Sequence, residues 1–199
     1  MPIVNFNNSR MSGLLEFIES LNSWGPKSRE LGLGTFEQSL GVPGLAPEDN
    51  CFLLEEGGRV RGFSLIFPEL PIGRSVLEMG IARDLEGTPQ ELELVRRSVD
   101  RARHIGAKVV HICVSGNPSR AKMLEAEGFS LVRVYWDMVW SQDELPDQER
   151  PQGFSVRSYQ PGDAADLTEA QNSAFEGSWG FCPNTVDQIE SRSQMPNTP

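Results

Sequence analysis

The spacing of hydrophobic residues changes repeatedly along the chain and predicts helices in alternation with strands. Apolar side chains recur every three or four residues over 9–22, 88–105 and 163–175, as on the buried face of a helix. Shorter helices are predicted over 35–41, 118–127 and 185–191. Runs rich in β-branched and aromatic residues predict strands over 2–6, 51–56, 59–67, 75–81, 109–114, 129–140 and 154–159. This alternation indicates an α/β fold.

Glycines mark a hairpin within the strand-rich part of the chain. Gly57-Gly58 separates two strand-like runs, and glycine pairs adopt the positive φ angles of a tight two-residue turn. Gly62 lies inside the second run, where it predicts a bulge or a close approach by other backbone.

The predicted helix 88–105 has the clearest start and end. Thr88 is a preferred N-cap, Pro89 suits the first turn, and Glu91 would complete a capping box with Thr88. Gly106 is a typical residue for ending the helix.

A polar stretch divides the chain. Residues 141–152 are acidic and contain two prolines, which predicts a linker. It separates a first domain over 1–140 from a segment over 153–199.

The composition and charge of the chain argue against some classes of binding partner. The 199 residues hold 18 Lys and Arg against 28 Asp and Glu, a net charge of −10. Such a chain repels phosphate groups, so we expect neither a nucleic-acid nor a membrane partner. No apolar run of about 18 residues is present, and no secretory leader is visible, so we expect a cytoplasmic protein. Three scattered cysteines predict neither a disulfide framework nor a metal site.

A family resemblance is concentrated in one segment. Residues 106–129, GAKVVHICVSGNPSRAKMLEAEGF, contain an apolar strand, then Asn117, then a helix, then Gly128-Phe129. Together with the order of elements over 1–140, this segment resembles the GNAT acetyltransferase superfamily. The resemblance implies an acyl-CoA N-acyltransferase-like mixed sheet with helices on both faces.

The rest of the chain is similar to the opening of a second domain of this kind. Its strand, its helix and its Phe-x-Pro segment resemble those of tandem-domain GNAT proteins of the mycothiol synthase type. The resemblance implies that 153–199 is an incomplete second domain and that this chain alone has little turnover.

The resemblance also implies acetyl-CoA as the acyl donor. In the family, two parallel strands splay apart and hold the pantetheine arm between them. Here those strands would be 75–81 and 109–114, with Met79, Gly80 and Ile81 along the arm.

A pyrophosphate-binding loop would follow over 83–90, with Gly87 and Thr88 as its expected contacts. The loop departs from the family's Arg/Gln-x-x-Gly-x-Gly/Ala pattern. The residues at the patterned positions are Leu85, Thr88 and Gln90, and acidic residues surround the helix start at Glu86, Glu91 and Glu93. We therefore expect residues 1–140 to bind acetyl-CoA weakly or not at all.

Few side chains are candidates for the chemistry. Glu78 on the splayed strand is either a general base toward the acceptor amine or a solvated residue. Asn117 either contacts the cofactor or caps the following helix. Leu124 stands where the family commonly has an acid-acting tyrosine, and is expected to pack in the core. His111 and Cys113 are expected to be a packed, inert pair.

Two functions are compatible with these features of the sequence. The first is an acyl-CoA-dependent N-acyltransferase that acts on a primary amine of a small molecule or peptide. The second is a non-catalytic acetyltransferase-like module that binds a ligand or supports a catalytic domain. A homodimer is compatible with either.

Overall fold

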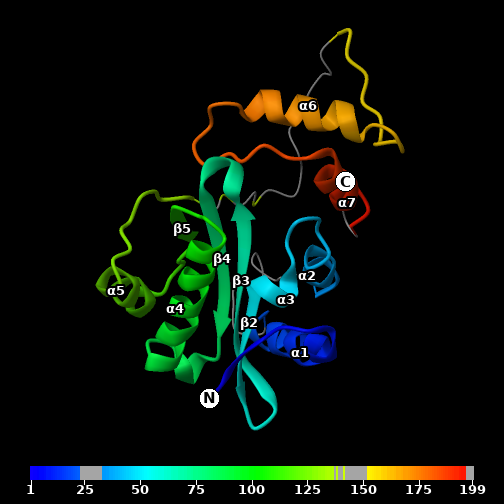
Figure 1. Ribbon diagram of the computed structural model, residues 1–199. Helices are drawn as coiled ribbons and strands as arrows, with labels where there is room; N and C mark the ends of the chain where they lie inside the picture. Colours follow the sequence, from blue (N-terminus) through cyan, green and yellow to red (C-terminus); the bar gives the residue numbers. More distant parts are fainter. Residues whose placement is uncertain (23–32, 137, 139–140, 142–151, 196–199) are drawn as a thin grey trace.

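The computed structural model describes residues 1–22, 33–136, 138, 141 and 152–195 (Figure 1). Five strands form a mixed sheet in the order β1-β2-β3-β4-β5. They are β1 (Ile3–Asn5), β2 (Cys51–Glu56), β3 (Arg59–Glu69), β4 (Arg74–Ile81) and β5 (Val109–Ile112). Neighbouring strands are antiparallel from β1 to β4, whereas β4 and β5 are parallel. The predicted α/β fold with a mixed sheet is confirmed.

Helices cover both faces of this sheet, as predicted. Those of the first part are α1 (Met11–Asn22), α2 (Leu33–Ser39), α3 (Pro47–Asn50), α4 (Pro89–His104) and α5 (Pro118–Ala126). Figure 1 shows α1 and α2 on one side of the sheet and α4 on the other. The short helix α3 was not expected from the sequence; it begins at a proline in its first turn.

The two faces are held by different contacts. Toward α1 and α2, the ring of Phe63 meets Phe17 and Phe36 edge-on, with centroids 6.5 and 5.5 Å apart. Toward α4, the hydroxyl of Ser98 lies 2.7 Å from that of Ser64 in the centre of the sheet. Both faces of the sheet are therefore apolar, and on the α4 side a buried polar contact is added between Ser98 and Ser64.

The predicted hairpin and the role of Gly62 are both confirmed. Gly57 and Gly58 have φ angles of 57° and 80°. The pairing of β2 with β3 shifts by one residue after Leu54, which is a bulge. A β-carbon at Gly62 would lie 2.5 Å from Cδ1 of Ile81, so the neighbouring strand also approaches closely there.

Two predicted strands are wrong where the structure describes them. Residues 129–136, and the whole of 154–159, are irregular; residues 137, 139 and 140 lie outside the described residues. Their large apolar side chains are exposed, with Trp136 at 85%. Alternation predicts a strand only if another strand completes its hydrogen bonds, and the described chain supplies none here.

Strand β5 also differs from its prediction. It ends at Ile112 instead of 114, and all four residues are exposed or half-buried. It is the last strand of the sheet, so one of its edges and part of its faces remain open.

The C-terminal segment contains the two predicted helices, α6 (Ala164–Phe175) and α7 (Val186–Ser193). The side-chain amide of Asn172 pairs twice with the backbone of Asn184, which joins the two helices. Figure 1 shows both helices beyond the turn between β3 and β4. The linker over 142–151 lies outside the described residues, and the division into 1–140 and 153–199 stays a prediction. Among the described helices, none is long and apolar enough to cross a membrane.

A buried hydroxyl provides a test of the β4 packing. The Ser75 hydroxyl is fully buried and has no hydrogen-bond partner in the described part of the chain. Because an unpaired buried hydroxyl is destabilising, Ser75→Ala is expected to raise the free energy of unfolding by about 0.5–1 kcal/mol. Ser64→Ala, which removes a paired hydroxyl, is the control and should lower it by a similar amount. Urea denaturation measures both; a loss of stability in Ser75→Ala would contradict the assignment.

Candidate functional site

Strand β4 extends past the end of β5, and we call the edge that this leaves unpaired over 78–81, among the described residues, the gap between β4 and β5. The two strands pair from Arg74 with Val109 to Leu77 with Ile112, and no further. Strand β4 continues through 78–81 while paired only with β3. The backbone edge of 78–81 that faces away from β3 therefore has no strand partner among the described residues. The prediction that 75–81 and 109–114 are parallel is confirmed where they pair, whereas their splaying stays a prediction because β5 ends at Ile112.

Met79, Gly80 and Ile81 lie at this gap with mostly buried side chains. Ile81 is 3% exposed and Met79 is half-buried. A β-carbon at Gly80 would collide with Leu21 of α1 and would lie 2.8 Å from the ring of Phe63. Because Ile81 is buried and Gly80 has no side chain, the backbone supplies most of the groups that this stretch can present to a ligand in the gap.

Glu78 projects from the same strand toward the α1 and α2 side. Strand alternation puts it on the face of Gly80, which packs against Leu21 of α1. Its side chain is exposed, yet the surrounding protein excludes enough water to raise the pKa of its carboxyl above the ordinary value. A raised pKa makes this carboxylate a stronger base than an ordinary surface glutamate.

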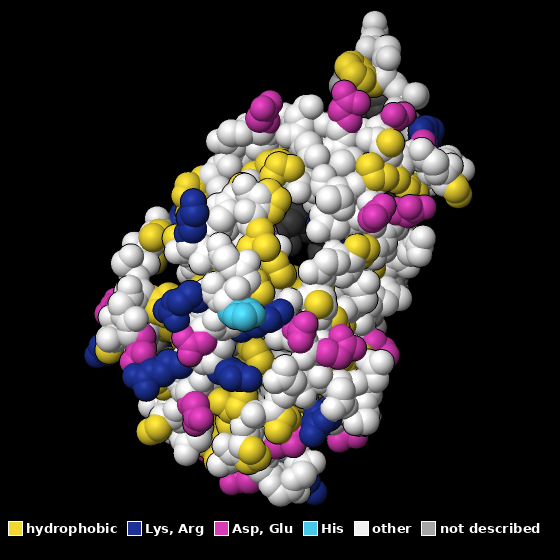
Figure 2. Space-filling view, in the orientation of Figure 1, with side chains coloured by type: hydrophobic (Ala, Val, Ile, Leu, Met, Phe, Trp, Pro, Cys, Tyr) yellow, Lys and Arg dark blue, Asp and Glu magenta, His cyan; other side chains and the backbone are white. Residues whose placement is uncertain are grey.

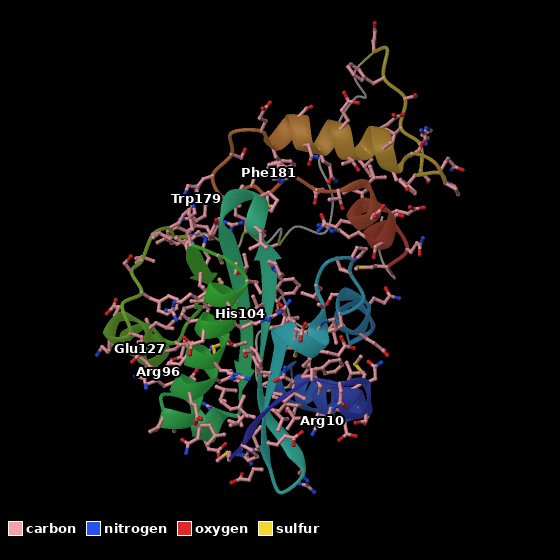
Figure 3. The ribbon with its side chains drawn as sticks, viewed as in Figure 1. Arg10, Arg96, His104, Glu127, Trp179 and Phe181 are labelled. Carbon is pink, nitrogen blue, oxygen red and sulfur yellow. The ribbon has the colours of Figure 1, made fainter. Side chains whose placement is uncertain are left out.

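The C-terminal segment contacts the sheet at the start of β4 and at β5. His111 pairs in register with Val76, two residues before Glu78, and its ring stacks on Trp179 with centroids 5.3 Å apart. The largely buried Arg74 donates to the carbonyl of Gly180 at 2.5 Å and lies 3.3 Å from Nδ1 of His111. Figure 3 shows Trp179 and Phe181 of this loop at the end of the sheet where β3 turns into β4.

The surroundings of His111 favour the neutral form of its imidazole. Partial burial and the charge of Arg74 lower the pKa of its imidazole, and the carboxylate of Glu69 opposes this only in part. The ring packs against Trp179 as expected, whereas Cys113 is exposed beyond the end of β5. The predicted packed pair of His111 and Cys113 is therefore wrong for Cys113, because the strand ends before it.

The start of α4 differs from the predicted capping box. Thr88 is at the N-cap position, but its hydroxyl donates to the carbonyl of Leu85 at 2.6 Å. Glu91 is fully buried, and its Oε2 accepts the N–H of Gly87 at 2.6 Å instead of reaching the N-cap. Gly87 has a φ of +72°, which turns its N–H toward this carboxylate.

The second oxygen of Glu91 is held by α5. Arg120 donates from Nε to Oε1 at 2.5 Å, and its side chain is only 15% exposed. Sequence analysis identified Glu91 as acidic but missed Arg120, because nothing in the pattern pairs two residues 29 positions apart. A buried carboxylate with its own cation therefore occupies the helix start.

This arrangement does not suit a bound pyrophosphate. Helix N-termini bind phosphate through free N–H groups and a positive dipole. Here the N–H of Gly87 is engaged by Glu91, the N–H of Thr88 lies 3.2 Å from the carbonyl of Leu85, and Pro89 has no N–H. The predicted contacts Gly87 and Thr88 lie in the expected loop, but their donors already have partners inside the protein.

A second ion pair joins α4 to α5 at the surface. Arg96 and Glu127 form two hydrogen bonds of 2.8 and 2.7 Å, and Arg96 is 61% exposed. Figure 3 shows the two side chains reaching toward each other. In Figure 2, Lys and Arg side chains on this side of the molecule are interspersed with Asp and Glu. The basic residues here do not form a patch of one sign.

Asn117 and Leu124 have structural roles in α5. Oδ1 of Asn117 accepts the N–H of Arg120 at 2.9 Å, which is the helix-capping alternative. Leu124 is 3% exposed and packs inside, so this position offers no hydroxyl.

The cap at Asn117 can be tested by mutation. Asn117→Ala is expected to lower the free energy of unfolding by about 1 kcal/mol, because it removes the acceptor for the N–H of Arg120. Asn117→Asp keeps the acceptor and is the matched control. Urea denaturation followed by circular dichroism measures both; equal losses would show that the cap contributes nothing.

Comparisons with known proteins give structural neighbours only. No family model matches the sequence, and no curated protein matches it. A GCN5-related N-acetyltransferase from Sphaerobacter thermophilus has a TM-score of 0.66 at 17% identity, covering 97% of this chain and 62% of that one.

Two further likenesses cover a smaller share of the chain. A ribosomal-protein-alanine N-acetyltransferase from Brucella melitensis has a TM-score of 0.51 at 18% identity, over 65% of this chain and 85% of that one. A transcriptional regulator from Bacillus halodurans C-125 has a TM-score of 0.52 at 13% identity, over 70% of this chain and 99% of that one. These likenesses, with the parallel β4–β5 pair of the mixed sheet, identify the fold of this chain as that of the GNAT acetyltransferases.

Proposed function

We propose that this protein acts in transfer of an acyl group from a thioester of the acyl-CoA type to a primary amine of a small molecule or peptide. The single observation that carries the proposal is the gap between β4 and β5, with Glu78 beside it. The acetyltransferase names of structural neighbours support the reaction class. Acetyl-CoA is the simplest donor of this type.

Glu78 is the proposed general base. An amine attacks a thioester only as the free base, so a proton must leave its nitrogen. The carboxylate of Glu78 can accept this proton because its surroundings stabilise the protonated form, as its raised pKa indicates. The neutral ring of His111 lies on the same face of the sheet and does not repel an incoming ammonium group.

A second candidate is a non-catalytic module with the same fold. It is favoured by the ion pair of Glu91 with Arg120 at the start of α4, and by Leu124 in place of a hydroxyl-bearing residue. Folds of this kind are shared by proteins with different functions, and one neighbour is named as a transcriptional regulator.

A direct assay separates the two functions. The full chain is incubated with acetyl-CoA and a panel of primary amines and peptides, and acylated products are detected by mass spectrometry. The proposal expects product that depends on both the protein and the amine, and that is strongly reduced in Glu78→Gln. Product formation unchanged by Glu78→Gln would remove Glu78 from the mechanism. No product from any amine would favour the non-catalytic module.

A further inference from the structure

We infer that the carboxylate of Glu91 takes the place of a donor's pyrophosphate at the start of α4, and that this protein recognises its acyl thioester through the pantetheine arm alone. The second half of this statement rests on the proposed acyl transfer. The substrate class is then acyl-pantetheine thioesters, with or without a nucleotide.

The hydrogen-bond donors around Gly87 already have partners inside the protein. The oxygens of Glu91 accept the N–H of Gly87 at 2.6 Å and the Nε–H of Arg120 at 2.5 Å. Each would otherwise be a donor to phosphate. With the N–H of Thr88 near Leu85 and no N–H at Pro89, positions 87–89 offer no unengaged backbone donor.

The charge of Glu91 and the packing of α5 also disfavour a phosphate at the start of α4. A phosphate at this point would meet a fully buried carboxylate of the same sign, whose counter-ion is already committed to it. The start of α5 also packs on the loop, since Cβ of Ser119 would be 3.8 Å from a β-carbon at Gly87. A ligand phosphate would have to displace both the carboxylate and this contact.

The unpaired edge of β4 remains open to a ligand. The backbone edge of 78–81 has no strand partner in the described chain. A pantetheine arm carries amides and can pair with an open strand edge as an extended peptide does. The open edge of β4 therefore retains groups for the arm, whereas positions 87–89 retain no unengaged backbone donor for the pyrophosphate.

The donor comparison uses the unmodified full chain. We expect acetyl-CoA and S-acetylpantetheine to give kcat/KM values within about threefold of each other, because the nucleotide half makes no favourable contact. A preference for acetyl-CoA of about tenfold or more would overturn the inference while leaving acyl transfer intact. No turnover with either donor would instead overturn the proposed function, and the inference would be decided by binding.

Binding is measured by calorimetry with CoA and pantetheine. The unmodified chain is expected to bind pantetheine and to bind CoA no more tightly; binding of neither would overturn recognition through the pantetheine arm. Glu91→Ala frees Gly87 and Arg120, so it should gain about tenfold or more in affinity for CoA but not for pantetheine. Glu127→Gln, which weakens the exposed α4–α5 ion pair, is the matched control and should gain nothing.

Circular dichroism verifies that each variant is folded. If Glu91→Ala fails to fold, Glu91→Gln removes the charge and keeps an acceptor for Gly87; it should give a smaller gain for CoA. Folded variants with no gain would overturn the claim that the carboxylate occupies the phosphate position. Tighter binding of CoA than of pantetheine by the unmodified chain would overturn it as well.

Discussion

Glu78→Gln is expected to lower kcat/KM for the proposed acyl transfer by about 10²–10⁴-fold relative to the unmodified chain, because it removes the proposed general base. Glutamine has nearly the shape of glutamate but cannot accept the amine proton. Initial rates with the best amine of the panel measure the change. Glu125→Gln, on the exposed surface of α5, is the matched control and should leave kcat/KM unchanged.

The same carboxyl determines the expected pH dependence. Because the pKa of Glu78 is raised, kcat/KM should fall as the pH decreases through a value above that of an ordinary glutamate. Glu78→Gln should lack this acidic limb. An unchanged acidic limb in the variant would assign it to another group.

The contribution of Glu78 to the free energy of unfolding should rise as the pH decreases, whereas kcat/KM should fall. A carboxyl with a raised pKa in the folded state destabilises the fold once the pH is above its folded pKa, where it is ionised. At low pH, where it is protonated in both states, this destabilisation is absent. Glu78→Gln is therefore expected to be at least as stable as the unmodified chain at neutral pH, as is common when an active-site charge is removed.

Features encoded within a few residues of sequence were predictable. The hairpin at Gly57-Gly58 depends only on two residues that adopt positive φ. The helix start at Pro89 and its end at Gly106 follow from local backbone preferences in the same way. Even the close approach at Gly62 could be read from a glycine inside a strand.

Features that depend on a partner distant in sequence were not predictable. Residues 129–136 have the alternation of a strand, but no strand pairs with them in the described chain. Glu91 looks like a capping residue until Arg120 is brought beside it by the packing of α5 on α4. Arg74 and Gly180 are 106 residues apart, so their contact has no local signal at all.

The candidate site likewise combines features that were predictable from the sequence with features that were not. The parallel strands and the position of Glu78 follow from element order, which the family resemblance supplied. The raised pKa of Glu78 depends on how much water the folded protein excludes around it. The engagement of the Gly87 donor at the start of α4 depends on Glu91 and Arg120, two side chains that only the tertiary structure joins.

Arg120→Met is expected to lower the free energy of unfolding by about 3–5 kcal/mol, because it leaves the buried carboxylate of Glu91 without its cation. Methionine retains most of the volume of the arginine stem, so lost packing contributes little. Arg96→Met removes the cation of the exposed pair with Glu127 and should cost about 1 kcal/mol or less. Urea denaturation of both variants measures the difference, and equal losses would show that Glu91 is solvated.

A double variant separates the charge from the contact. Arg120→Met combined with Glu91→Leu removes both charges and leaves apolar side chains of similar size, so most of the lost stability should return. The N–H of Gly87 loses its acceptor in this variant, which limits the recovery by about 1–2 kcal/mol. A double variant no more stable than Arg120→Met would mean that the ion pair is indispensable to the packing of α4 on α5. Full recovery would mean instead that the ion pair adds nothing to stability. The effect of the pair would then be on ligand binding, because Glu91 of the unmodified chain still occupies the start of α4.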